Sequence, residues 1–179
     1  MKILGVDPGS VICGYGVVES HSGKFSVVEY GVVRVRKKSI ELPVRLKEIY
    51  LRITEVIKRT CPDAAVFESL FFSKNVQSLV KLSHARAAAV LAAAMYDLPI
   101  TEYSPREIKK SVTGNGNASK EQVQYMVKTL LKIDETPEFF DVTDALAAAV
   151  CHSFRANMPR KATNSWSDYI KQNPAKVIR

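Results

Sequence analysis

The chain has 179 residues, of which 46% are hydrophobic, enough for one domain with a sizeable core and too few for a large multidomain protein. Its 26 Lys and Arg residues exceed its 18 Asp and Glu residues, and the net charge of +8 favours a polyanionic partner. Three widely spaced cysteines match neither a disulfide framework nor a C-x-x-C metal site. The sequence shows neither a signal peptide nor an apolar run of transmembrane length, so we expect a cytoplasmic protein with reduced thiols and no membrane contact.

Three β-prone segments open the chain. They cover residues 2–7, 14–19 and 25–35, with the turn residues Pro8-Gly9-Ser10 and Ser22-Gly23 between them. Such short connections predict antiparallel neighbours.

Helices and short strands then alternate. Apolar residues recur at helical spacing from Leu42 until Cys61-Pro62, a strand is predicted at residues 64–67, and a long helix from about Asn75 to Tyr96. A further strand is predicted near Ile100 to Tyr103. Strands separated by helices indicate parallel pairing.

The last third of the chain is predicted to be helical. Ser104-Pro105 begins a short helix, Ser119 and Gln122 have the spacing of a capping box for a helix ending near Lys132, and a last helix begins near Phe140. The predicted fold is therefore α/β, with a mixed five-stranded sheet flanked by helices over residues 1–156. Residues 157–179 are predicted to form a flexible basic tail.

Four acidic residues stand at the ends of predicted elements. Asp7 and Glu68 each close an apolar strand, and Asp141 and Asp144 lie three residues apart, on one side of the last helix. If that helix crosses the sheet, its first turn brings both acids toward the two strand ends. Each acid alone has an ordinary interpretation, such as a turn hydrogen bond or a helix N-terminal charge. Their shared placement makes a site more credible.

Converging carboxylates repel one another, and divalent cations resolve this repulsion while the acids stay ionised. Ligation by oxygen alone favours Mg²⁺ or Mn²⁺ over zinc. In a basic protein such a site suits phosphodiester hydrolysis with two ions. Lys109, Lys110 and Lys120 are candidates to bind the scissile phosphate, although ordinary surface charge also explains them.

The chain resembles the RuvC family of bacterial Holliday-junction resolvases over roughly residues 3–152. The resemblance rests on these segments: Gly5-Val6-Asp7-Pro8-Gly9-Ser10, Gly14-Tyr15-Gly16-Val17, Leu42-Pro43-Val44-Arg45-Leu46, Glu68 with Phe71 and Lys74-Asn75, Leu82 to Arg86, Lys109, Gly114-Asn115-Gly116, Lys120 to Val127, and Asp141-Val142-Thr143-Asp144-Ala145-Leu146-Ala147.

The resemblance implies an RNase H-like fold and a homodimer that nicks two strands of like polarity symmetrically in a four-way DNA junction, during homologous recombination and DNA repair. It also implies dependence on Mg²⁺, with Mn²⁺ as a substitute and two ions per site, and work with the RuvA and RuvB branch-migration machinery.

The family's functional residues transfer to named positions of this chain. The metal-binding acids fall on Asp7, Glu68, Asp141 and Asp144, and the catalytic or phosphate-binding lysines fall on Lys109 and Lys120. Phe71 matches the aromatic residue that engages the junction, where a stacked base is worth about 1–3 kcal/mol. Its neighbour Phe72 is equally apolar, so one of the two is expected to pack inward. Lys74, Asn75 and Lys110 complete the predicted DNA contacts.

The helix near Ala85 to Met95 is more apolar than one sheet-facing stripe requires, which indicates either a dimer interface or a fully buried helix. Two other functions remain as alternatives. An ATP-binding protein of the actin, heat-shock chaperone and sugar-kinase type also places an Asp on its opening hairpin, but it needs a second domain. A junction-binding protein without catalytic activity is the other, and the four acids argue against it.

Overall fold

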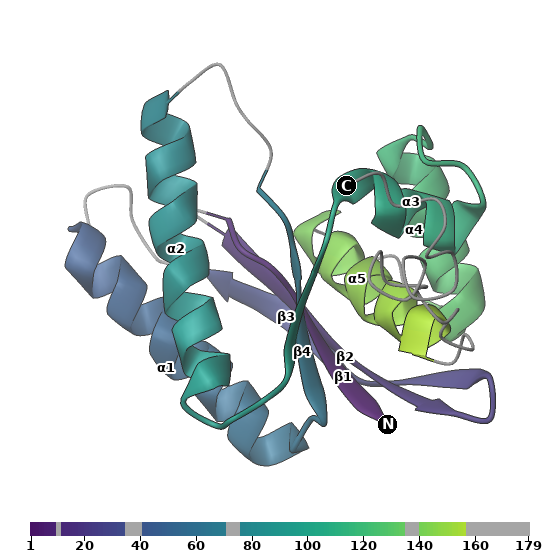
Figure 1. The fold of residues 1–179 in the computed structure, drawn as a ribbon, viewed down its shortest axis with the longest axis horizontal. Coiled ribbons are helices and arrows are strands. Elements are labelled where there is room, and N and C mark those ends of the chain that lie inside the picture. The colour runs from purple at the N-terminus through teal and green to yellow at the C-terminus, as the bar shows by residue number, and fades with distance from the viewer. Residues whose placement is uncertain (10–11, 35–40, 71–75, 135–139, 157–179) are drawn as a thin grey trace, which may run out of the picture.

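The computed structural model describes residues 1–9, 12–34, 41–70, 76–134 and 140–156 (Figure 1). Its five strands form one sheet in the order β3-β2-β1-β4-β5. The strands are β1 (Lys2–Asp7), β2 (Ile12–His21), β3 (Lys24–Arg34), β4 (Ala64–Glu68) and β5 (Ile100–Tyr103). The helices are α1 (Leu42–Thr60), α2 (Val76–Ala94), α3 (Pro105–Thr113), α4 (Lys120–Leu131) and α5 (Phe140–Ala156).

The strand pairing confirms the predicted mixed sheet. The strand β1 pairs with β2 in antiparallel orientation and with β4 in parallel, while β4 pairs in parallel with β5. The strand β2 extends beyond its predicted 14–19 at both ends. The helix α2 ends at Ala94, two residues before the predicted end, and the chain reverses through Asp97, whose φ is 52°.

Helices cover both faces of the sheet, with α1 and α2 on one face and α3, α4 and α5 on the other (Figure 1). Alternate residues of each strand enter opposite cores. In β1, Ile3 packs with α4 and α5, whereas Leu4 and Val6 pack with α1 and α2. In β4, Val66 lies on the α5 side and Phe67 on the other. The two central strands are therefore buried on both faces.

Capping residues fix where α3 and α4 begin. The Ser119 hydroxyl accepts a hydrogen bond from the backbone N–H of Gln122, and the Gln122 side chain accepts one from the backbone N–H of Ser119, as predicted. An equivalent capping box, which was not predicted, begins α3, where Ser104 and Glu107 cap each other in the same way. These caps satisfy backbone donors that a helix start otherwise leaves unpaired.

The helix α5 lies directly on the backbone of β1 and β2, because glycines leave room for it. A Cβ added at Gly5 would stand 1.9 Å from the carbonyl oxygen of Ala145, and one added at Gly14 would stand 2.1 Å from that of Asp141. No other residue fits either position without moving the helix. These contacts set the height and direction of α5 over the sheet.

The remaining expectations concern the thiols, membrane contact and the tail. Cys13, Cys61 and Cys151 are free thiols, and in the described part of the chain no helix is long and apolar enough to span a membrane. The predicted tail, 157–179, lies outside the described residues, so the domain boundary at residue 156 stays a prediction.

Candidate active site

Asp7 and Glu68 occupy the ends of neighbouring strands on the same face of the sheet. Side chains two residues apart in a strand share a face, so Asp7 follows Ile3 and Gly5 toward α5, and Glu68 follows Val66. The register pairs Val6 with Phe67, which puts Asp7 and Glu68 side by side at the next position of these parallel strands. The sheet thus brings together two carboxyl groups that are 61 positions apart in the sequence.

The start of α5 supplies the other two acids. Asp141 lies in the first turn of the helix and Asp144 one turn further, and both are partly buried. Gly14, which pairs with Asp7 across the hairpin, contacts the backbone of Asp141. Because no side chain separates α5 from β2 at this point, the acidic turn of the helix lies over the ends of the central strands.

The pKa values of Asp7, Glu68 and Asp144 respond to neighbouring acidic charges. Burial, followed by the charges of Glu68, Asp144 and Asp141, raises the pKa of Asp7 from 3.8 to about 8. Burial and the charge of Asp144 raise the pKa of Glu68 to about 7. Without a counter-ion, these strand-end carboxyl groups therefore hold protons near neutral pH.

Lys120 brings a positive charge into contact with the acids. Its Nζ stands 3.3 Å from Oδ2 of Asp144. Burial raises the pKa of Asp144 and Lys120 lowers it, with a net rise. Burial also opposes the charge on Lys120, yet the carboxylates of Asp144, Asp7 and Asp141 hold its pKa above the ordinary value. Lys120 is the first residue of α4, so the capping box at Ser119 fixes the position from which it reaches the acids.

Lys109 has a different environment from the one expected. Its Nζ donates a 2.7 Å hydrogen bond to the carbonyl oxygen of Ala118, the residue before the α4 cap. Its charge still lowers the pKa of both Glu68 and Asp144. Lys109 therefore ties α3 to the start of α4 and adds positive potential to the site. Lys110, the next residue, is exposed.

The donor set fits a hard divalent cation, since all four groups are carboxylates and their repulsion is of the kind that such an ion relieves. The acids are not arranged as a complete metal site in this structure. Among the described residues, no group of three or more acidic, histidine or cysteine side chains is placed to hold a metal ion. The ammonium of Lys120 contacts Asp144 in this arrangement.

The site thus brings together six of the predicted residues: Asp7, Glu68, Asp141, Asp144, Lys109 and Lys120. The predicted DNA contacts Phe71, Lys74 and Asn75 lie outside the described residues. Sequence reasoning missed Gly5 and Gly14 as the residues that let α5 approach. A glycine inside an apolar strand is the signal that could have found them, because it often marks a close approach of another backbone.

Comparisons with known proteins agree with this architecture. The family model "Crossover junction endodeoxyribonuclease RuvC" matches residues 3–152. The protein of that name from Alkaliphilus metalliredigens is 49% identical over 86% of this chain and 93% of its own length. The one from Chloroherpeton thalassium is 45% identical, and the match covers both chains completely.

Solved structures show the same fold. Thermus thermophilus RuvC in complex with a Holliday junction substrate superposes with a TM-score of 0.83 at 33% identity, over 88% of this chain and 96% of that one. The yeast mitochondrial Holliday junction resolvase shares the fold alone, with a TM-score of 0.61 at 12% identity over 83% of this chain and 77% of its own. Neither the nucleotide-binding alternative nor the inactive one gains support from these matches. The chain belongs to the RuvC family of crossover junction endodeoxyribonucleases.

Proposed function

We propose that this chain resolves Holliday junctions with Asp7, Glu68, Asp141 and Asp144 as the ligands of its catalytic metal ions. The observation that carries the proposal is the convergence of these four carboxyl groups at one edge of the sheet. Glu68, Asp144 and Asp141 all lie close enough to Asp7 to raise its pKa. Membership of a family of crossover junction endonucleases indicates the substrate, a four-way DNA junction. The oxygen-only ligands indicate catalysis with hard divalent cations.

We assign the ions as Mg²⁺, with Mn²⁺ as a substitute, and two per site. Four ionised carboxylates carry four negative charges, and two divalent cations balance them. When bound, such ions activate a water molecule and stabilise the leaving oxygen of the cut strand. The part of the protein is to hold the carboxyl groups in place at the strand ends and in the first turns of α5, whereas the charge of the bound ions would keep them ionised.

Lys120 and Lys109 act on the DNA phosphate in this proposal. Lys120 is already drawn into the site by Asp144, and a cation bound to that carboxylate would free its ammonium to contact a phosphate oxygen. Lys109 contributes positive potential and keeps the start of α4 in place through Ala118. We expect Phe71, Lys74 and Asn75 to contact the junction, as the family resemblance implies.

A homodimer would let two such sites cut two strands symmetrically. The exposed side of α2 supports this, because Val76, Val80 and Leu91 are 69%, 47% and 54% exposed. At 100° per residue these three positions fall within about 60° of one another around the helix, so they form one apolar stripe. We propose that this stripe packs against a second copy of the chain, and that the dimer works with RuvA and RuvB in the cytoplasm.

A cleavage assay tests the proposal. A labelled, mobile four-way junction is incubated with the protein in Mg²⁺, Mn²⁺ or EDTA, using wild type, Asp7→Asn and the control Asp97→Asn. Asp97 lies in the turn after α2 with a φ of 52°, a conformation that asparagine also adopts. We expect paired symmetric nicks from wild type and the control with either metal, and none from Asp7→Asn, which should still bind. Metal-independent cutting, or full activity of Asp7→Asn, would refute the assignment.

A further inference from the structure

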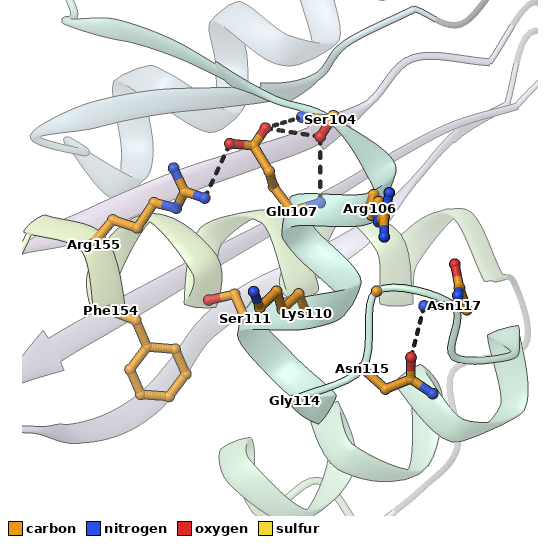
Figure 2. Close-up of a pocket in the computed structure, with 11 residues that line it drawn as sticks. Ser104, Arg106, Glu107, Lys110, Ser111, Gly114, Asn115, Asn117, Phe154 and Arg155 are labelled. Atoms are coloured by element: carbon orange, nitrogen blue, oxygen red, sulfur yellow. Dashed lines mark hydrogen bonds and ion pairs between the residues drawn. The ribbon is translucent and has the colours of Figure 1, made fainter.

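A groove separate from the candidate active site lies on the outer side of α3. It is a groove of about 1080 Å³ between α3, the loop of residues 114–117 and the last turn of α5 (Figure 2). Its charged lining is mostly basic, with Arg106, Lys110 and Arg155 against the single acid Glu107. The four proposed metal ligands are not among its lining residues.

Within the groove, one cation is already neutralised and two are available. Arg155 forms an ion pair of 3.0 Å with Glu107, which also accepts hydrogen bonds from the backbone N–H and the hydroxyl of Ser104. Figure 2 shows these contacts at one end of the groove. The side chains of Arg106 and Lys110 have no hydrogen bond or ion pair with any residue of the described chain. Among the described residues, the groove therefore presents two positive charges that have no acidic partner.

Two cations of the groove share a face of α3 with a lysine that affects the candidate active site. Arg106, Lys109 and Lys110 have the spacing i, i+3 and i+4, so they share one face of the helix. Lys109 is close enough to the acids to lower the pKa of Glu68 and Asp144. The positive face of α3 thus runs from the carboxylates outward to the groove.

The loop after α3 adds hydrogen-bond donors. The Oδ1 of Asn115 accepts the backbone N–H of Asn117 at 2.9 Å, and the hydroxyl of Thr113 accepts that of Asn115 at 3.1 Å. These bonds fix the loop and leave the amide NH₂ group of Asn115 as a donor at the groove. Gly116 lets Arg106 lie along the loop, since an added Cβ would stand 2.7 Å from Cγ of Arg106.

We propose that this groove binds the phosphodiester backbone of one junction arm, beside the strand that enters the active site. The inference rests on the proposed function for its ligand. It adds Arg106 and the 114–117 loop to Lys110, which the sequence already predicts as a DNA contact, and makes the three one contact surface. Arginine, lysine and amide donors suit phosphate oxygens, and one helical turn separates the two cations, about 5–6 Å between Cβ atoms. Because the contacts are to phosphate, they add affinity and orientation without sequence preference.

The dependence of junction binding on salt tests this assignment. We compare wild type, the double variant Arg106→Gln/Lys110→Gln, and the control Lys47→Gln/Lys58→Gln, whose lysines are exposed on α1 across the sheet. Binding of a labelled junction is measured in EDTA, so that no strand is cut, between 50 mM and 1 M salt. Both variants lose two charges, so only the position differs.

We expect the groove variant to bind with a salt slope shallower by about 1.8, because each phosphate contact contributes about 0.9. If the groove variant and wild type bind equally at 1 M salt, this difference in slope corresponds to about 60-fold weaker binding by the groove variant at 0.1 M salt. The charge-retaining variant Arg106→Lys/Lys110→Arg should recover the wild-type slope, and the α1 control should retain it.

An unchanged slope in the groove variant, or an equal change in the α1 control, would overturn the assignment. A thermal melt of each variant excludes misfolding, and the charge-retaining variant repeats the test at the same two positions. A wild-type protein that binds the junction but cuts it with neither metal would refute the proposed function instead. The two failures are distinguishable because the binding slope requires no cleavage.

Discussion

Replacing Asp7 with asparagine removes the carboxyl group whose pKa rises from 3.8 to about 8 on folding, through burial and then the neighbouring acids. Between pH 5 and pH 7 the unfolded chain carries this group ionised, while the folded, metal-free protein keeps it protonated. The folded state then binds about one proton more than the unfolded state. Through Asp7 alone, the free energy of unfolding of wild type therefore falls as the pH rises, by about 1.4 kcal/mol per pH unit.

Over these two pH units the loss amounts to at most about 2.7 kcal/mol. Asp7 keeps part of its exposure, so we expect a loss of about 1–3 kcal/mol relative to Asp7→Asn. Urea unfolding in EDTA at pH 5 and pH 7 measures it, with Asp97→Asn as the matched control. Asparagine at position 7 carries no charge at either pH, so its stability should change less between them.

Adding Mg²⁺ at pH 7 should reverse the loss in wild type, because a ligand that binds only the folded state stabilises it. The gain is about 2.7 kcal/mol when the free ion is at 100 times its dissociation constant. Asp7→Asn should gain less, since it lacks one ligand. The reasoning fails if wild type and Asp7→Asn differ by the same amount at both pH values, or if Mg²⁺ stabilises them equally.

Three further predictions test the surroundings of the acids. Lys120→Gln should lower the cleavage rate by about 10²-fold and, because Lys120 holds down the pKa of Asp144, should move the acid limb of the pH–rate profile to higher pH. Gly14→Ala should cost about 1–3 kcal/mol of stability in urea unfolding and most of the activity, since its Cβ would meet the backbone of Asp141. Gly31→Ala, which meets only the Tyr15 side chain, is its control, and an equal loss there would contradict the packing argument. Leu91→Glu should give a monomer in sedimentation velocity, whereas a monomeric wild type would refute the proposed dimer stripe on α2.

Local patterns in the sequence account for most of the secondary structure. The apolar run ending at Asp7, the alternation of helices and strands after residue 42, and the capping spacing of Ser119 and Gln122 each depend on neighbouring residues only. The structure confirms the strands at Lys2–Asp7 and Ile100–Tyr103 as predicted, and it confirms the mixed sheet. The family could also be identified from the sequence, because its motifs are short segments whose residues and order along the chain can be read directly.

The arrangement of the site depends on contacts between residues that are distant in the sequence. Only the tertiary structure determines these contacts. No local pattern shows that Lys109 donates to the Ala118 carbonyl rather than contacting the acids directly, since that bond requires α3 and the start of α4 to meet. The register of Val6 with Phe67 places Asp7 beside Glu68, and Gly5 and Gly14 let α5 lower Asp141 and Asp144 over them. The sequence alone thus determined which residues carry charge and at which element ends. Only packing decided how closely the charges approach, because the pKa of a carboxyl group depends on its burial and on charges that the fold brings within a few ångströms.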